Sequence, residues 1–264
     1  MTGASHRPTP GDRRRIAWRS GLLQSVWNYE TLQAVGFAWA LLPGLDRLYP
    51  DREARSRRLA AHLEIFNSNP YLASLGLGVA LRLEAEVARG AAGAERRLER
   101  LLRALRGTLG ALGDQLFWAG WRPALGLAAV VAVLGTGSPW VAAVYLLAYN
   151  TLAQTVRARG VDAGYASGAG IARVLQDPFW RRATEACRTA GAFAAGAALG
   201  AGATWALAGG VRGAGVFSLS LVLLWLAGAR AGSRGGRVLS PPLAFLLILA
   251  LLSAIVHFTD GASG

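Results

Sequence analysis

The stretch WAGWRPALGLAAVVAVL, residues 118–134, decides the fold class of this chain. No charged side chain follows Arg122 within it. Its length lies at the lower end of the roughly 17–25 residues that carry a helix across a bilayer. Two tryptophans at its start suit the membrane–water interface, where aromatic rings gather. We therefore predict a membrane-spanning helix here.

Four further apolar runs follow, separated by Gly, Pro or Arg clusters, so that five spans are predicted in all. Hydrophobic residues make up 53% of the chain, more than one soluble domain of this length needs. The predicted fold class is an all-α, polytopic integral membrane protein. The four further runs are residues 140–156, 189–208, 216–229 and 243–256.

The formal charge of +13 raises the question of nucleic-acid binding. The basic residues are scattered at the ends of apolar runs, and no helix-turn-helix, zinc-ligand or RNP-like pattern accompanies them, so we expect no nucleic-acid partner. Arginines instead concentrate in residues 157–188 and 230–237. The positive-inside rule assigns those loops to the cytoplasm. Five spans then leave the N-terminus cytoplasmic and the C-terminus extracytoplasmic.

Cys187 is the single cysteine, which excludes an intrachain disulfide and any Cys-based metal site built from this chain alone. No Gly-Lys-Ser/Thr phosphate loop is present either. We expect no metal, no cofactor and no catalytic residue. Residues 1–15, polar and basic, are predicted to be a cytoplasmic tail rather than a cleaved signal peptide.

Residues 16–116 differ from the membrane region at 117–264, because their apolar runs are interrupted or short. Residues 16–48 show helical spacing that Pro43 and Gly44 should break or kink. Residues 70–83 are too short to cross a bilayer, so a re-entrant helical hairpin is predicted. Because the arginine-rich start and residues 107–122 are both assigned to the cytoplasm, the segment between them must enter and leave on one side. Such hairpins surround substrate sites in transporters.

Two amide-rich and aromatic-rich motifs lie in this region: WNYETLQ at 27–33 and HLEIFNSNP at 62–70. Amides both donate and accept hydrogen bonds, and flat aromatic faces stack on sugars, so the pattern suits a ligand rich in hydroxyl groups. From the first motif we expect side chains that share one helix. From the second we expect either caps at a helix stop before Pro70 or sugar contacts. The candidate substrate-binding residues are Asn28, Tyr29, Glu30, Gln33, Asn67 and Asn69.

The order and wording of these motifs resemble the IID subunit of the mannose/fructose/sorbose-type sugar phosphotransferase system (PTS). A third segment, from Gly113-Asp114 to Trp121-Arg122-Pro123, resembles the family's Gly-Asp…Trp…Arg-Pro stretch, and residues 145–168 agree more weakly. Asp114 and Arg122 are therefore candidates for a gating or partner contact, although both tryptophans also fit interfacial anchoring.

The resemblance implies a bacterial inner-membrane subunit that pairs with a IIC membrane subunit to bind and translocate a hexose. It also implies that phosphoryl transfer occurs on separate IIA and IIB subunits, so that no histidine of this chain is phosphorylated. Family members carry Arg-Met after the motif glutamate, where this chain has Thr31-Leu32. That departure leaves open an alternative, a non-transporting scaffold or regulatory subunit. A third possibility is a polybasic lipid-binding protein, which would use the amphipathic stretch at residues 94–106.

Overall fold

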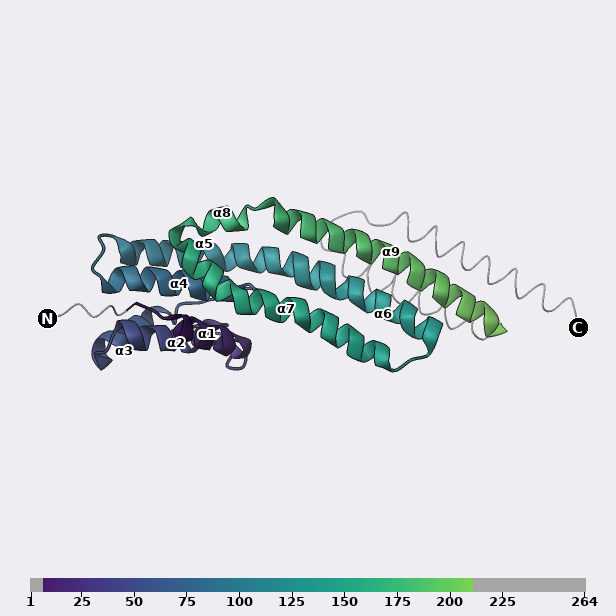
Figure 1. The fold of residues 1–264 in the computed structure, drawn as a ribbon, viewed down its shortest axis with the longest axis horizontal. Helices are drawn as coiled ribbons and strands as arrows, with labels where there is room; N and C mark the ends of the chain where they lie inside the picture. Colours follow the sequence, from purple (N-terminus) through teal and green to yellow (C-terminus); the bar gives the residue numbers. More distant parts are fainter. Residues whose placement is uncertain (1–6, 211–264) are drawn as a thin grey trace, which may run out of the picture. The chain divides into compact units, whose positions relative to one another are not determined.

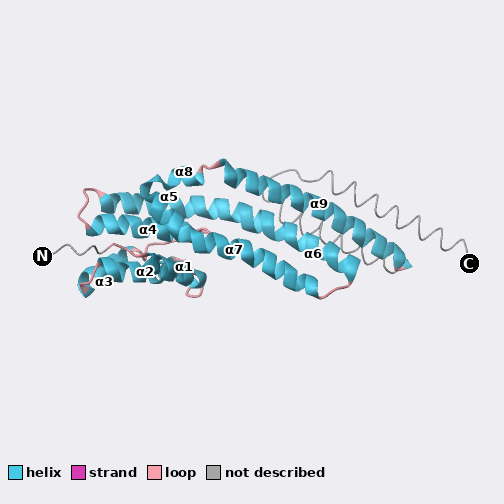
Figure 2. Ribbon diagram, in the orientation of Figure 1, coloured by secondary structure: helices cyan, strands magenta, loops and turns pink. Residues whose placement is uncertain are grey.

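The computed structural model describes residues 7–210, and within that range the chain is helices joined by loops, without a β-strand (Figure 2). The all-α prediction is confirmed. Two compact units are present, one of Met1–Gly126 with Ala142–Gly191 and the other of Leu127–Val141 with Ala192–Gly264. The predicted spans at 216–229 and 243–256, and the arginine loop at 230–237, lie outside the described residues.

Figure 1 shows the order of the helices along the chain. The first half contains α1 (Pro10–Arg19), the short 3-10 turn η1 (Ser20–Leu22), α2 (Ala34–Leu48), α3 (Arg52–Ala61), α4 (Ala73–Ala88) and α5 (Ala94–Gly113). The second half contains the π-helical segment η2 (Asp114–Trp121), α6 (Arg122–Thr136), α7 (Trp140–Ser167), η3 (Gly168–Gly170), α8 (Ile171–Leu175) and α9 (Pro178–Ala208).

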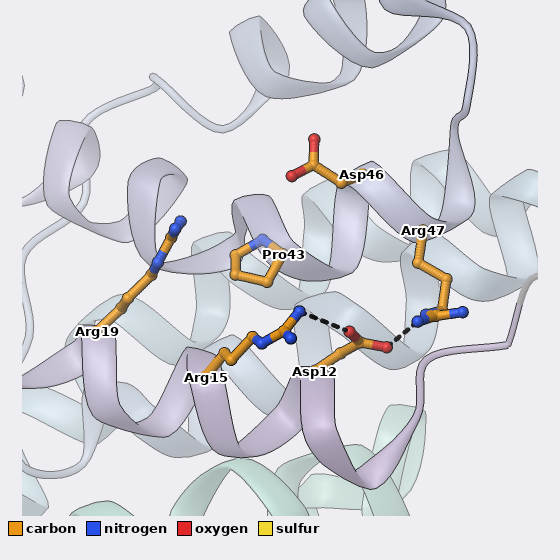
Figure 3. A pocket seen from close by; sticks show the side chains of 6 residues that line it. All are labelled: Asp12, Arg15, Arg19, Pro43, Asp46 and Arg47. Atoms are coloured by element: carbon orange, nitrogen blue, oxygen red, sulfur yellow. Dashed lines mark hydrogen bonds and ion pairs between the residues drawn. The ribbon is translucent and has the colours of Figure 1, made fainter.

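Helix α1 begins inside the segment predicted as a tail. Thr9 and Asp12 form a reciprocal capping box, and Pro10 occupies the first helical position, where its missing N–H costs nothing. Asp12 is buried and accepts a hydrogen bond from Arg47 Nε of α2 at 2.6 Å, and Arg15 lies on its other side (Figure 3). Residues 10–15 are therefore part of the folded first unit.

Of the break or kink predicted at Pro43, the break is wrong, because helix α2 continues to Leu48. A proline inside a helix leaves the carbonyl four residues earlier without its N–H donor. In α2 that carbonyl belongs to Trp39, and it accepts a hydrogen bond from Arg19 Nη1 at 3.1 Å. The Arg19 guanidinium also lies 4.7 Å from the centre of the Trp39 ring. An arginine of α1 thus supplies the missing donor and allows the helix to continue.

Helices α4 and α5 form a hairpin whose two arms pack along each other. The turn between them contains Gly90 and Gly93, both at positive φ, where glycine is favoured. Most of the stretch predicted as a re-entrant hairpin, residues 70–83, lies in one arm of this longer hairpin, and its re-entry into a membrane stays a prediction. The basic stretch at 94–106 is amphipathic as expected, but its apolar face is buried in the core of the first unit, which leaves no apolar face for a lipid surface. The buried leucines of that face are Leu98, Leu102 and Leu105.

Helices α4 and α7 touch backbone to backbone through glycines. A Cβ on Gly78 would lie 2.1 Å from the Val161 carbonyl oxygen, and one on Gly164 would lie 2.1 Å from the Leu75 carbonyl oxygen. Gly160 and Gly164 are four residues apart, the small-xxx-small spacing that lets membrane helices approach closely. On α9, a Cβ on Gly191 would lie 3.6 Å from Ala124 Cβ, whereas one on Gly196 or Gly200 would have nothing within 4 Å among the described residues.

A buried ion cluster joins α3 to α4. The Glu84 carboxylate is fully buried and accepts hydrogen bonds from His62 Nε2 at 2.7 Å, Arg58 Nη2 at 2.8 Å and the Tyr49 hydroxyl at 2.7 Å. Burial opposes ionisation of Glu84, but these donors outweigh it and lower its pKa to about 2. His62, which begins the second motif, is therefore a buried partner of Glu84.

Two stretches of continuous helix are long and apolar enough to cross a membrane, Ala94–Thr136 and Pro178–Ala208. They contain the predicted spans at 118–134 and 189–208. Most of their apolar residues are not buried within the chain. The predicted span at 140–156 is helical, within the 28-residue α7, but this helix is less apolar than the other two and is not counted with them. Exposed apolar side chains along α6, α7 and α9 include those of Val133, Leu147, Phe193 and Trp205.

Candidate functional site

The two sequence motifs meet in space, although they lie about 35 residues apart. Leu32 and Phe66 form a parallel bridge, in which Gln33 N donates to Phe66 O at 2.8 Å and Phe66 N donates to Thr31 O at 3.2 Å. We call residues 28–33 and 66–69 the loop pair. It is non-helical and precedes α2 on one side and α4 on the other. Both predicted motifs therefore contribute to one site.

The prediction that the first motif is helical was wrong. Asn28 Oδ1 accepts hydrogen bonds from the backbone N–H groups of Glu30 at 3.0 Å and Thr31 at 2.8 Å, which closes a turn around its own side chain. Asn side chains compete with helix formation in this way. Leu32 then adopts φ = 58°, an unusual conformation for a branched residue. Such strain persists only where the surroundings fix it, and it occurs often at functional sites.

Gln33 holds the two loops together. Its side chain is 2% exposed and pairs with one peptide unit of the second loop: Nε2 donates to Ser68 O at 2.8 Å, and Ser68 N donates to Oε1 at 3.0 Å. Both polar ends of the amide are thereby used inside the protein. Gln33 consequently positions the site rather than facing a ligand.

We expect Gln33→Ala to destabilise the subunit, because it leaves the Ser68 N–H and C=O buried without partners. Each such group costs about 1–3 kcal/mol, so the total loss is on the order of 3 kcal/mol. Thermal unfolding of the detergent-solubilised chain measures it, with the exposed Asn67→Ala as the control that stays near wild type. A normal unfolding temperature with lost sugar binding would instead identify Gln33 as a ligand contact.

Asn69 links the second motif to the third. It is 1% exposed, and its Nδ2 donates to Asp114 Oδ1 at 3.0 Å, while its Oδ1 accepts from the Tyr71 N–H at 3.1 Å. The contact requires a glycine beside it, since a Cβ on Gly113 would lie 2.3 Å from Asn69 Cβ. Three motifs distant in sequence thus converge here, and Gly113 explains why the third begins with glycine.

Asp114 opens η2, a π-helical segment of eight residues within the helical stretch from α5 to α6. π-helical turns are rare and occur often at functional sites. Arg122, predicted as a companion of Asp114, has no carboxylate partner among residues 7–210. Its guanidinium lies 5.5 Å from the Trp118 ring centre instead. Asp114 therefore joins the site, whereas Arg122 flanks it through Trp118.

An aromatic group beside the loop pair was not predicted as part of the site. The hydroxyls of Tyr71 and Tyr149 lie 3.0 Å apart, and the Tyr71 ring packs on Phe117 with centres 4.6 Å apart. The Arg157 guanidinium also lies over the Tyr71 ring, 5.1 Å from its centre. The members of this group are spread from residue 71 to residue 157, so no local pattern announces them. Two signals in the sequence were available: the adjacency of Tyr71 to Asn69-Pro70 and the weak family resemblance of residues 145–168, which contain Tyr149 and Arg157.

The remaining candidates point outward. Tyr29 is 90% exposed and packs edge-on against Trp27, with ring centres 4.8 Å apart. Glu30 and Asn67 are also exposed, and within residues 7–210 neither side chain makes a hydrogen bond or ion pair. Because Glu30 is exposed, its carboxylate carries no desolvation cost in the isolated chain. The loop pair thus exposes the Glu30 carboxylate, the Asn67 amide and the Tyr29 ring, while the side chains of Asn28 and Gln33 hold its backbone.

The described residues define a class of protein: a helical protein with two helices long and apolar enough to cross a membrane, and with a polar loop site that precedes α2 and α4. A family profile described as the PTS system mannose/fructose/sorbose family IID component matches residues 9–204. The chain belongs to this family.

Two relatives illustrate its range. The mannose-specific EIID component of Escherichia coli (strain K12) is 34% identical over 199 residues, which is 75% of this chain and 70% of that protein. The fructose permease IID component of Bacillus subtilis (strain 168) is 27% identical over 179 residues, 68% of this chain and 65% of that protein.

Solved structures agree with the fold. A chain in the cryo-EM structure of the mannose transporter ManYZ with microcin E492 (MceA) matches with a TM-score of 0.58 and 34% identity, over 73% of this chain and 70% of that one. A structure described as that of a membrane protein matches with a TM-score of 0.65 and 35% identity, over 72% of this chain and 70% of that one. This chain is thus the IID component of a mannose-type PTS permease, and it is a membrane protein.

Proposed function

We propose that this subunit forms, with a IIC membrane subunit, the sugar translocation unit of the permease in the bacterial inner membrane. A hexose enters this unit and is phosphorylated on its cytoplasmic side by a IIB subunit, which receives its phosphoryl group from IIA. The N-terminus is cytoplasmic and the C-terminus extracytoplasmic, as the distribution of loop arginines favours. The mannose transporter ManYZ, to which this chain is similar, supports a membrane complex of this kind.

The loop pair is the proposed sugar-facing surface. The observation that carries this proposal is the backbone pairing of Leu32 with Phe66, which holds Glu30 and Asn67 on one rigid surface. A carboxylate accepts hydrogen bonds from sugar hydroxyls, an amide accepts and donates, and the Tyr29 ring offers a stacking face. Asn28, Gln33 and Asn69 fix the backbone of this surface. We propose that the IIC subunit covers the site, because Tyr29, Glu30 and Asn67 are exposed on the isolated chain.

Preorganisation gives the arrangement its value. Binding is stronger when the groups that contact a ligand are already held in place, since less conformational freedom is lost. In this chain, the turn at Asn28 and the hydrogen bonds between Gln33 and Ser68 hold the backbone of the two loops in place. Transport then requires the loaded site to face each side of the membrane in turn, by movement of the hairpin-bearing part against the spanning helices.

The test is sugar uptake by cells that express Glu30→Gln or Asn67→Ala in place of the natural subunit, together with IIC and the phosphocarriers. A hydrogen bond that involves a charged group contributes about 1.5–3 kcal/mol, so we expect Glu30→Gln to lower uptake at limiting sugar by about tenfold or more. Asn67→Ala should act in the same direction. The level of subunit in the membrane should not change, because both side chains are exposed.

Glu53→Gln is the matched control, since it removes an exposed carboxylate on α3, away from the loop pair. It should leave uptake unchanged. Normal uptake by both Glu30→Gln and Asn67→Ala would remove the loop pair from the sugar path.

The contacts of Thr31 and Leu32 argue against the alternative of a non-transporting scaffold, which rested on these two residues. The Thr31 hydroxyl lies 3.0 Å from Asn28 Nδ2 and accepts its hydrogen bond, and the Thr31 backbone carbonyl accepts from Phe66. Leu32 forms both backbone bridges of the loop pair. These residues support the site in place of the Arg-Met of other members, so the departure does not dismantle it.

A further inference from the structure

A groove in the first unit carries positive charge without a counter-ion. It has a volume of about 580 Å³ and lies between the end of α1 and the middle of α7. No carboxylate lines it within the described part of the chain. Its charged and polar lining residues are Arg14, Gln154 and Arg157, and its apolar wall includes Trp18 and Leu22.

Arg157 is the central group of this groove. Its Nη1 donates to Gln154 Oε1 at 2.9 Å, and its guanidinium lies over the Tyr71 ring. Its Nε is buried and finds no acceptor among residues 7–210, and no carboxylate there lies within ion-pair distance. A half-buried guanidinium normally pairs with an anion, because its desolvation is otherwise uncompensated. Arg157 therefore has a charge, and a donor without a protein acceptor among residues 7–210, that suit an anion.

Arg157 follows a run of exposed apolar side chains on α7. Val144, Leu146 and Leu147, earlier on the same helix, are exposed apolar side chains of the kind that face lipid. On the α1 side, Trp18 is 73% exposed and Leu22 is also exposed. Tryptophan beside arginine is the pattern of a membrane–water interface. An acyl chain could lie along the apolar wall while the arginines meet its headgroup.

We propose that this groove binds the phosphodiester of an anionic phospholipid, with Arg157 and Arg14 as its ligands. Guanidinium groups match phosphate oxygens in geometry and form two parallel hydrogen bonds with them. Basic pockets between helices bind anionic headgroups by the same chemistry. The backbone at Gly21 leaves room for the guanidinium, since even an added Cβ there would lie 3.8 Å from Arg157 Nη1. The bound lipid would tie α1 to α7.

The experiment uses the full chain co-expressed with IIC, purified in a neutral detergent and stripped of lipid. Native mass spectrometry titrates phosphatidylglycerol, phosphatidylcholine of the same chain length, or inorganic phosphate. We expect phosphatidylglycerol to bind more tightly than phosphatidylcholine, and Arg157→Gln to weaken that binding on the order of tenfold, as for the loss of one charge-assisted hydrogen bond. Arg14→Gln, at an exposed residue that does not support the fold, should weaken it in the same direction.

Arg159→Gln is the matched control, because it removes an exposed charge from the same helix outside the groove. Three outcomes would overturn the proposal. The first is equal lipid affinity for the Arg157, Arg14 and Arg159 variants. The second is saturation of the site by inorganic phosphate with no preference for phosphatidylglycerol, which would assign it to a free anion. The third is loss of IIC from Arg157→Gln with unchanged lipid binding, which would make the groove a subunit interface.

Discussion

We expect Gly164→Ala to destabilise the protein strongly, because the added methyl group has no room between α7 and α4. The added Cβ would lie 2.1 Å from the Leu75 carbonyl oxygen and 3.0 Å from Val79 N, both backbone atoms of α4. Backbone cannot rotate aside as a side chain can, so α4 and α7 must separate. Overpacking costs about 1–3 kcal/mol and sometimes more. We expect the upper end, which corresponds to a fall of roughly 10 °C in unfolding temperature.

Gly107→Ala supplies the comparison within one experiment. Gly107 lies on α5 and an added Cβ there has nothing within 4 Å among the described residues. Alanine favours a helix over glycine by about 1 kcal/mol, so this variant should be as stable as the natural chain or more so. Thermal unfolding of both detergent-solubilised variants separates the two effects. Equal unfolding temperatures would mean that α4 and α7 do not meet at Gly164.

Glu84→Gln is the second change with a large expected effect. It keeps the shape of the side chain but leaves Arg58 and His62 beside an uncharged amide in a buried site. Removing one partner of a buried ion pair costs about 3–5 kcal/mol. Arg58 keeps its ion pair with Glu95, which should hold the loss near the lower figure. Glu53→Gln breaks an exposed pair with Arg57 and should cost less than about 1 kcal/mol.

The pH dependence of stability reports on Glu84 independently. Its pKa is lowered in the folded chain from an ordinary 4.5 to about 2, so between these values the unfolded chain binds the proton more readily. The stabilisation is therefore complete above about pH 4.5 and is lost as the pH falls toward 2. We expect Glu84→Gln to show a smaller fall in unfolding temperature over this acid range than the natural chain. Identical acid profiles would contradict the ion cluster.

Hydropathy was sufficient to predict the membrane class and the helices at 118–134 and 189–208, because desolvation of a long apolar run dominates every local preference. It could not predict where α2 begins. The Asn28 side chain closes its own turn, and Leu32 adopts a left-handed conformation fixed by pairing with Phe66. That pairing is a tertiary contact, and no helical periodicity in residues 27–33 reports it. The break predicted at Pro43 failed because of a tertiary contact as well: Arg19 of α1 donates the hydrogen bond that the Trp39 carbonyl otherwise lacks.

The sequence predicted six site residues, but it did not predict which of them are buried and which are exposed. Six residues were proposed to contact sugar because all are polar or aromatic and lie in the two motifs. The side chains of Gln33 and Asn69 are hydrogen-bonded to Ser68 and Asp114, whereas those of Glu30 and Asn67 are exposed. Which amide meets a backbone and which meets solvent depends on how the loops pair, and composition does not carry that information. The sugar-facing role of the outward residues stays a prediction.

The most direct test of the account is uptake of labelled mannose and fructose by cells that carry the IIC, IIB and IIA genes, with and without this subunit. We predict that omission abolishes uptake, and that sugar phosphate accumulates inside the cell only when the subunit is present. Unchanged uptake and unchanged sugar phosphate on omission would contradict a translocation role and would favour a scaffold or regulatory subunit.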